Sequence, residues 1–346
     1  MYSIFFLLLL ILALVSIETR VIKASYDIYV KIFLQLLVIV FILLVGLRKV
    51  GVAVDDFNYS YMFTGAIQGH LHKDIAFNLI ANYLGQLNLV FFVFALTSIS
   101  LKSFFIFKTT KYFGLVFLLY FSSYFFLHDF VQIRAAVSSA LLLWIIYFLG
   151  NKNFFIIAIL TALAIAFHLS AIIFIPLFFL RKKNTKKLYL VLGVVSLLLA
   201  FVYSININSF ESFIPELFFK RLKFFLEKDG ASANLLNPIV LMQYVFAILI
   251  FLNWDKLVND SKYSVYVVKI FLIGLYVFLI LNKFPKIGFR VYELLMIVQL
   301  PLADILIRNA KPKSVVVSFV ILLSMLYYYY YVIKYPVINP YLFFFQ

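Results

Sequence analysis

The residues of this chain that could do chemistry are a few ionisable side chains beside long apolar runs. Arg48, Arg134 and Arg290 each stand at one end of an apolar stretch. A guanidinium stays charged at any physiological pH and grips two phosphate oxygens in a planar fork. Any one of these arginines could instead snorkel to lipid phosphates. All three together, with Lys283 and Lys286, predict a phosphate-binding site.

The candidates for proton transfer are one histidine and two aspartates. His168 lies in "AIAFHLSAIIF", where no charged residue neighbours it in the sequence. An imidazole with an unperturbed pKa near ~6.5 can accept a proton at neutral pH, although a buried histidine more often only completes a hydrogen bond. Asp55 and Asp56 follow Gly51 in a polar turn. Either aspartate could be a general base, could orient one, or could pair with an arginine.

Three amide side chains recur at four-residue spacing in "KDIAFNLIANYLGQLN". Asn78, Asn82 and Gln86 would share one face of a helix. Such amides could bond sugar hydroxyls or could line the wet side of an interfacial helix. The chain has no cysteine, and its four histidines lack metal-ligand spacing. We therefore expect no thiol chemistry, no metal and no other cofactor.

Composition assigns the chain to the membrane. Hydrophobic residues make up 66% of the 346 residues and charged residues 13%, and apolar runs of spanning length recur throughout. In such a chain the net charge of +16 reports loop topology rather than nucleic-acid binding. The opening "MYSIFFLLLLILALVSIETR" has no basic start and no small-residue cleavage site, so we interpret it as a first spanning helix. The sequence predicts one all-helical, polytopic membrane domain over residues 1–346.

We expect about twelve membrane segments. Their predicted ranges are about 3–17, 28–47, 85–101, 112–127, 133–149, 154–167, 169–180, 188–205, 236–253, 264–281, 288–307 and 314–331. The stretch between Asn153 and Arg181 could be one tilted helix or two short helices that meet at His168. Two short helices place more Lys and Arg on the inner side, as the positive-inside bias requires. We therefore expect the broken pair, with both termini outside.

The predicted break has a chemical consequence. Helices this short cannot cross a hydrocarbon core ~30 Å thick at ~1.5 Å rise per residue, and irregular backbone at that depth survives only in a protein interior or beside a wet cavity. Ser170 would cap the second half-helix, whose free N–H groups would favour an anion. His168 would then lie at the floor of an outward-facing cavity.

The outer face collects nearly all the unusual polar residues under this topology. It includes a large loop of about 206–235, in which "PELFFKRLKFFLEKDG" predicts an amphipathic interfacial helix. That helix would anchor the loop to the membrane or cover the cavity mouth. An ionisable residue at membrane depth is a functional hypothesis by default, because burying its charge is costly.

The order of three segments resembles the EpsG family, which is grouped with the Wzy polymerases of O-antigen and capsular repeat units. The segments are "LRKVGVAVDDFNYSYMF", "QIRAAVSSALLLWIIYFLG" and "NKNFFIIAILTALAIAFHLSAIIFIPLFFL". The positions that correspond to the family pattern are Arg48, Gly51, Asp55, Tyr59, Ile133, Arg134, Ala164, Phe167, His168, Ser170, Ala171, Arg290 and Tyr292. Two departures stand out: an extra residue precedes the aspartates, which leaves Asp55 and Asp56 as alternatives, and Ala135 replaces a usual glutamine.

The resemblance implies a GT-C-like membrane glycosyltransferase of the bacterial cytoplasmic (inner) membrane, with its site facing the periplasm or exterior. It would join oligosaccharide repeat units carried on undecaprenyl pyrophosphate, which serve as donor and acceptor, and a chain-length regulator protein would be a further partner. His168, Asp55 and Asp56 would be catalytic. Arg48, Arg134, Arg290 and Lys286 would bind pyrophosphate, and Tyr59, Tyr292 and the three amides would bind sugar.

Two other functions need a similar site. A ligase would move finished glycan from the same carrier to another acceptor, and a flippase would move the lipid-linked unit across the bilayer. A transporter should show internal repeats and charges toward both faces. The sequence shows no convincing repeat, which favours the polymerase.

Overall fold

The computed structural model describes residues 2–22, 24–70, 73–180, 185–205 and 233–345. Within these ranges the chain is helical and forms no β-strand beyond two isolated bridges. The first half contains α1 (Tyr2–Ile22), α2 (Ala24–Gly46), α3 (Asp56–Ile67), α4 (Ile75–Leu84), α5 (Leu87–Thr109), α6 (Phe113–Tyr120), the π-helix η1 (Phe121–Val131), α7 (Ile133–Asn151) and α8 (Phe154–Phe167). The second half contains the 3₁₀ helix η2 (Leu169–Phe179), α9 (Lys186–Ile205), α11 (Pro238–Val258), α12 (Ser264–Ile280), α13 (Pro285–Met296), α14 (Gln299–Asn309), α15 (Lys313–Tyr328) and the π-helix η4 (Tyr329–Lys334).

Six helical stretches of the described chain are long and apolar enough to cross a membrane. They are Ile28–Gly46, Leu87–Thr109, Phe113–Val131, Ile133–Asn151, Pro238–Val258 and Lys313–Lys334. The all-helical membrane class is confirmed, whereas twelve segments and a GT-C-like fold remain predictions. The expected span 288–307 is two helices, α13 and α14. Helix α4 lies where a helix carrying Asn78 and Asn82 was expected, whereas α3 was not expected as a separate element. The predicted interfacial helix falls on residues outside the described ranges.

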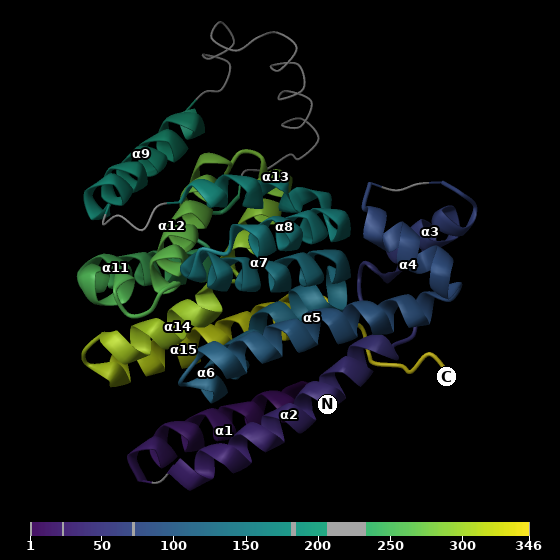
Figure 1. Cartoon of the computed structure of the whole chain (residues 1–346), viewed down its shortest axis with the longest axis horizontal. Helices are drawn as coiled ribbons and strands as arrows, with labels where there is room; N and C mark the ends of the chain where they lie inside the picture. The colour runs from purple at the N-terminus through teal and green to yellow at the C-terminus, as the bar shows by residue number, and fades with distance from the viewer. Residues whose placement is uncertain (1, 23, 71–72, 181–184, 206–232, 346) are drawn as a thin grey trace, which may run out of the picture.

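The helices pack side by side around α7. The helix α7 contacts α5, α8, α12 and α13, while α1 and α2 form an outer pair that packs on α6 and α5 (Figure 1). Helices α3 and α4 lie together at one end of the bundle, on the right in Figure 1. The opposite end holds the turns between α11 and α12 and between α14 and α15.

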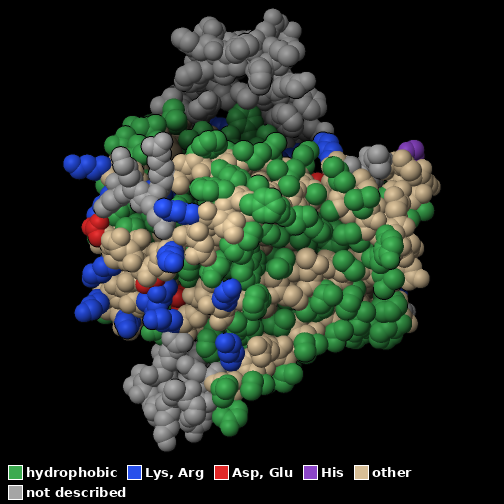
Figure 2. Space-filling view, viewed as in Figure 1, with side chains coloured by type: hydrophobic (Ala, Val, Ile, Leu, Met, Phe, Trp, Pro, Cys, Tyr) green, Lys and Arg blue, Asp and Glu red, His purple; other side chains and the backbone are tan. Residues whose placement is uncertain are grey.

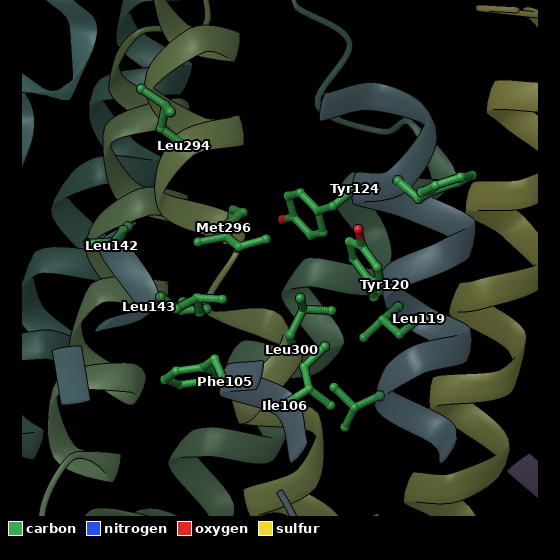
Figure 3. Packing of buried hydrophobic residues seen from close by; sticks show 14 of the residues in the cluster. Phe105, Ile106, Leu119, Tyr120, Tyr124, Leu142, Leu143, Leu294, Met296 and Leu300 are labelled. Carbon is green, nitrogen blue, oxygen red and sulfur yellow. The ribbon is translucent and has the colours of Figure 1, made fainter. Parts of the chain in front are cut away.

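Apolar side chains fill the space between these helices. Figure 3 shows Phe105 of α5, Leu119 of α6, Leu143 of α7 and Met296 of α13 in the space between their helices, and all four are buried. Since lipid is as apolar as these side chains, helices in a membrane associate through such close packing rather than through a hydrophobic driving force. On the outside, Figure 2 shows a broad band of hydrophobic side chains across the visible face.

The helix break at His168 is confirmed. Helix α8 ends at Phe167, His168 takes an extended conformation (φ −152°, ψ 111°), and η2 begins at Leu169. The expected capping role of Ser170 is wrong, because His168 precedes the first residue of η2 and Ser170 lies inside that helix. The break matters because it brings His168 to the end of the bundle where α4 begins.

The C-terminal tail fixes the loop between α2 and α3. Backbone hydrogen bonds join Lys49 N to Leu342 O (2.9 Å) and Asn339 N to Val52 O (2.7 Å). The Asn339 amide also donates to the Gly51 carbonyl (2.8 Å). The tail therefore holds the segment from which α3 starts.

Candidate functional site

A cavity of about 590 Å³ at the α3–α4 end of the bundle gathers side chains from five parts of the chain. Its polar lining is Asp55, Tyr59, Lys73, Asp74, Gln132, Arg134, His168, Ser170 and Arg290. Asp55 and Tyr59 come from the start of α3, Asp74 immediately precedes α4, Arg134 lies in the first turn of α7, and Arg290 comes from α13. Residues far apart in sequence thus meet at one site, which we call the cationic cavity.

Asp74 lies at the centre of the cationic cavity and is 3% exposed. Its Oδ2 accepts a hydrogen bond from Arg134 Nη1, and His168 Nδ1 lies 3.8 Å from the same oxygen. Its Oδ1 accepts the backbone N–H of Leu169 at 2.8 Å. The Asp74 carboxylate therefore connects the start of α4 to α7 and to the break between α8 and η2.

The sequence predicts that an anion binds at the start of the helix after His168, and in the structure that anion is the Asp74 carboxylate. The free N–H of Leu169 binds Asp74 rather than a ligand, since an unpaired N–H at a helix start favours a negative charge. Burial by itself would raise the pKa of Asp74, but its interaction with His168, the charge of Arg134 and the Leu169 N–H together lower that pKa below its ordinary value of 3.8. Asp74 is therefore ionised at neutral pH.

Arg134 keeps part of its guanidinium available. Its side chain is 24% exposed, and its Nε is buried without a hydrogen-bond partner among the described residues. The guanidinium carbon lies 5.4 Å from the centre of the Tyr59 ring, which is itself buried between Phe77 and Phe91. Asp74 and Tyr59 thus fix the guanidinium in place while leaving donors for a ligand.

The lining carries an excess of positive charge. Three permanent cations, Lys73, Arg134 and Arg290, stand against two carboxylates, Asp55 and Asp74. One of these carboxylates is already paired with Arg134. An anion that enters the cavity meets unneutralised positive charge, as a phosphate site requires.

A known protein family matches most of the sequence. The sequence model of the EpsG family matches residues 31–343. This chain belongs to the EpsG family. EpsG is a Wzy-type polymerase-like family, so the protein is a membrane protein of the polysaccharide-polymerase type. Comparisons with curated proteins and with solved structures gave no match.

Arg48 and Asp56 of this EpsG family member do not line the cationic cavity. Arg48 Nη2 and Nε both donate to the Asp56 carboxylate, at 2.8 and 3.1 Å from Oδ1, and neither side chain is exposed. Arg48 also donates to the Val45 carbonyl (2.7 Å), and Asp56 accepts the Ala53 N–H (2.8 Å). This buried pair closes the α2–α3 loop, and it leaves Asp55 as the aspartate that faces the cavity.

The other predicted binding residues of the EpsG chain are dispersed. Lys286 is exposed one turn before Arg290 and is outside the cavity lining, and Tyr292 lines a second cavity. Asn78 is buried in α4, whereas Asn82 and Gln86 are exposed. The three amides do not share a helix face as expected, because Gly85 (φ 64°) ends α4 before Gln86.

Lys73, Asp74 and Gln132 line the cavity without having been predicted from the sequence. Lys73 and Asp74 stand at the head of "KDIAFNLIANYLGQLN", where an aspartate before an apolar helix is typical of an ordinary N-cap. Asp74 does precede α4 but makes no side-chain cap hydrogen bond. Within the described ranges no three His, Asp or Glu side chains lie close enough together to ligate a metal ion.

Proposed function

We propose that this protein polymerises oligosaccharide repeat units linked to undecaprenyl pyrophosphate into O-antigen, capsule or exopolysaccharide, at the outer face of the cytoplasmic membrane. The observation that supports this most strongly is the cationic cavity around Asp74. It combines a guanidinium held in place, two further cations and an imidazole at a helix break. Pyrophosphate needs the cations, and glycosyl transfer needs a proton acceptor beside them.

In the proposed reaction a hydroxyl of the incoming lipid-linked unit attacks the anomeric carbon of the growing chain. The new glycosidic C–O bond forms as the bond between that carbon and the pyrophosphate oxygen breaks. Arg134 and Arg290, with Lys73, would stabilise the charge that develops on the departing pyrophosphate. Preorganised donors are effective because they need not reorient during the reaction.

The proton of the attacking hydroxyl would go to His168. Its Nδ1 faces the ionised Asp74 at 3.8 Å, so the imidazolium that forms would be stabilised by the carboxylate. Arginine cannot take this role, because its pKa is too high. Asp55 lines the same cavity and accepts a hydrogen bond from Asn58 (3.2 Å), which makes it the second candidate for the base.

The test is polymerisation by the purified protein in nanodiscs supplied with lipid-linked repeat units, read as a ladder on a glycan gel. We expect a ladder from the wild type, and at least a tenfold slower one from Arg134→Ala, Arg290→Ala and His168→Ala. Lys286→Ala is the matched control for Arg290→Ala, because Lys286 lies one turn away outside the cavity.

Two outcomes would overturn the proposal. Wild-type rates in both Arg134→Ala and Arg134→Lys would show that the cationic cavity does not bind the leaving group. Transfer of the intact lipid-linked unit across the bilayer without any ladder would make the protein a transporter. Asp55→Asn and His168→Ala, compared at equal expression and thermal stability, distinguish the two candidate bases.

A further inference from the structure

A second cavity, of about 350 Å³, lies on the other side of α13. It is bounded by η1, α13, the end of α15 with η4, and the chain that leads into α11. Six tyrosines line it: Tyr124, Tyr292, Tyr327, Tyr330, Tyr331 and Tyr335. We call this the tyrosine cavity.

The tyrosine cavity has a fixed floor and an open rim. At the floor, Tyr327 donates to Gln299 Oε1 (3.2 Å) and accepts from Gln243 Nε2 (3.1 Å), and Gln299 Nε2 donates to the Tyr124 hydroxyl (3.1 Å). At the rim, Tyr335 is 60% exposed. The rings therefore form a wall that runs from the surface to a hydrogen-bonded interior.

Polar groups within this wall are available to a ligand. The Tyr292 hydroxyl is buried and makes no hydrogen bond of ordinary length to the part of the chain that the structure describes. Buried hydroxyls are normally paired, so an unpaired one in a cavity lining is available to a ligand. The lining also includes Glu293 and the amides of Asn234 and Asn237.

One side-chain hydrogen bond links the two cavities. Gln132 lines the cationic cavity, Glu293 lines the tyrosine cavity, and Gln132 Nε2 donates to Glu293 Oε2 at 2.9 Å. Helix α13 forms the rest of the partition, with Arg290 on the cationic side and Tyr292 on the other. A ligand in one cavity would therefore lie next to a ligand in the other.

The lining chemistry selects the class of ligand. Among the described lining residues Glu293 is the only charged side chain. One cation, Lys334, lies outside the lining with its Nζ 5.1 Å from the Tyr330 ring centre and 5.2 Å from that of Tyr335, so the interior of the cavity is suited to a neutral polar ligand rather than to a phosphate. Sugar rings present an apolar C–H face that packs on aromatic rings, and their hydroxyls bond carboxylate, phenol and amide groups. A stacked pair, Tyr327 and Tyr331 with ring centres 5.9 Å apart, provides such a surface.

We propose that the tyrosine cavity is a saccharide-binding site that holds the sugars of a repeat unit beside the pyrophosphate in the cationic cavity. This inference rests on the proposed function for the identity of the saccharide. Glu293 and the Tyr292 hydroxyl would bind sugar hydroxyls, and the rim tyrosines would select the shape of the repeat unit.

The test measures saccharide binding without lipid or pyrophosphate. The probe is the repeat-unit oligosaccharide released from the host's surface polysaccharide by partial acid hydrolysis, detected by saturation-transfer NMR on the protein in nanodiscs. We expect Tyr330→Ala and Glu293→Gln to weaken binding about tenfold. Tyr329→Ala is the matched control, since Tyr329 is the neighbouring, 45% exposed tyrosine outside the cavity lining.

The outcomes separate this inference from the proposed function. Arg134→Ala should keep wild-type saccharide binding while it loses the ladder. Saccharide binding that depends on Tyr330, in a protein that makes no ladder, would support the site and refute polymerisation. Equal binding by wild type and Tyr330→Ala, no binding at all, or displacement by undecaprenyl phosphate alone would overturn the saccharide site.

Discussion

Asp74 is a buried carboxylate that holds several parts of the cationic cavity together, although the residues around it in the sequence do not predict this role. It contacts a cation from α7, an imidazole at the α8–η2 break and a backbone N–H of η2. Removing it would leave Arg134 without its buried partner and Leu169 N–H without an acceptor. An unpaired buried donor costs on the order of 1–3 kcal/mol.

We predict that Asp74→Asn lowers polymerisation at least tenfold and also lowers thermal stability. Because the pKa of Asp74 is depressed in the fold, its charge stabilises the protein fully above the ordinary value of 3.8, and this contribution is lost as the pH falls through the depressed pKa. The melting temperatures of wild type and variant should therefore converge as the pH falls below about 3.8. A difference that does not shrink below that pH would contradict this account.

At the level of elements, a buried ion pair holds η1 against α5. Lys102 Nζ lies 2.8 Å from Asp129 Oδ1, and neither side chain is exposed. Ser98 and Tyr120 donate to the same carboxylate at 2.6 and 2.7 Å. The π-helical winding of η1 places Asp129 where these three donors meet, two residues before η1 ends.

We predict that Lys102→Met alone destabilises the protein by about 3–5 kcal/mol, because it leaves an uncompensated charge in the interior. The double variant Lys102→Met/Asp129→Leu should regain much of this loss, since both charges are gone. Thermal unfolding of the two single variants and the double variant, all in one detergent, gives the coupling energy. Additive losses would show that the two side chains do not interact.

The C-terminal tail is the second element whose role can be tested. It pairs with the α2–α3 loop through Asn339 and Leu342, and that loop leads directly to Asp55 and Tyr59. We predict that removing residues 337–346 lowers the melting temperature and slows polymerisation several-fold, although no tail residue lines the cationic cavity. Phe345→Ala is the control, because that ring is 69% exposed. Unchanged activity in the truncated protein would show that α3 is held without the tail.

At the scale of the whole molecule, charge is distributed unevenly between the two ends. Figure 2 shows Lys and Arg side chains gathered at the end opposite α3 and α4. There Arg308 Nη1 bonds Asp260 (2.6 Å) and its Nε bonds Asp304 (2.8 Å), which joins the α11–α12 turn to α14. Because positive loops stay on the cytoplasmic side, this asymmetry supports a cationic cavity that opens outward.

The absence of cysteine makes that orientation directly testable. We predict that Asn82→Cys and Asn234→Cys react with a membrane-impermeant maleimide in intact spheroplasts. Lys262→Cys and Lys313→Cys, exposed at the opposite end, should react only after permeabilisation. The reverse pattern would place the cationic cavity on the cytoplasmic side and rule out polymerisation at the outer face.

Local composition and spacing were enough to predict the all-helical membrane class and several residues of the cationic cavity. Apolar length predicted the membrane helices, and the charge bias across the short segments around His168 predicted a break that the structure confirms. Arg134, His168 and Arg290, selected as ionisable groups beside apolar runs, and Asp55, selected in a polar turn, all line one cavity. These signals are readable because each depends on residues within a few positions of one another.

Only the tertiary structure decided which charges are paired with which. Asp74 and Arg134 are 60 residues apart in sequence, so no local pattern links them. Arg48 follows the end of α2 and Arg134 lies in the first turn of α7, so both are arginines at the end of an apolar helix. Arg48 nevertheless pairs with Asp56 in a closed loop and does not line the cavity. Likewise Arg290 and Tyr292, two positions apart, face different cavities because α13 forms the partition between them. A side chain's partner depends on how distant helices pack, and that packing is a property of the whole chain.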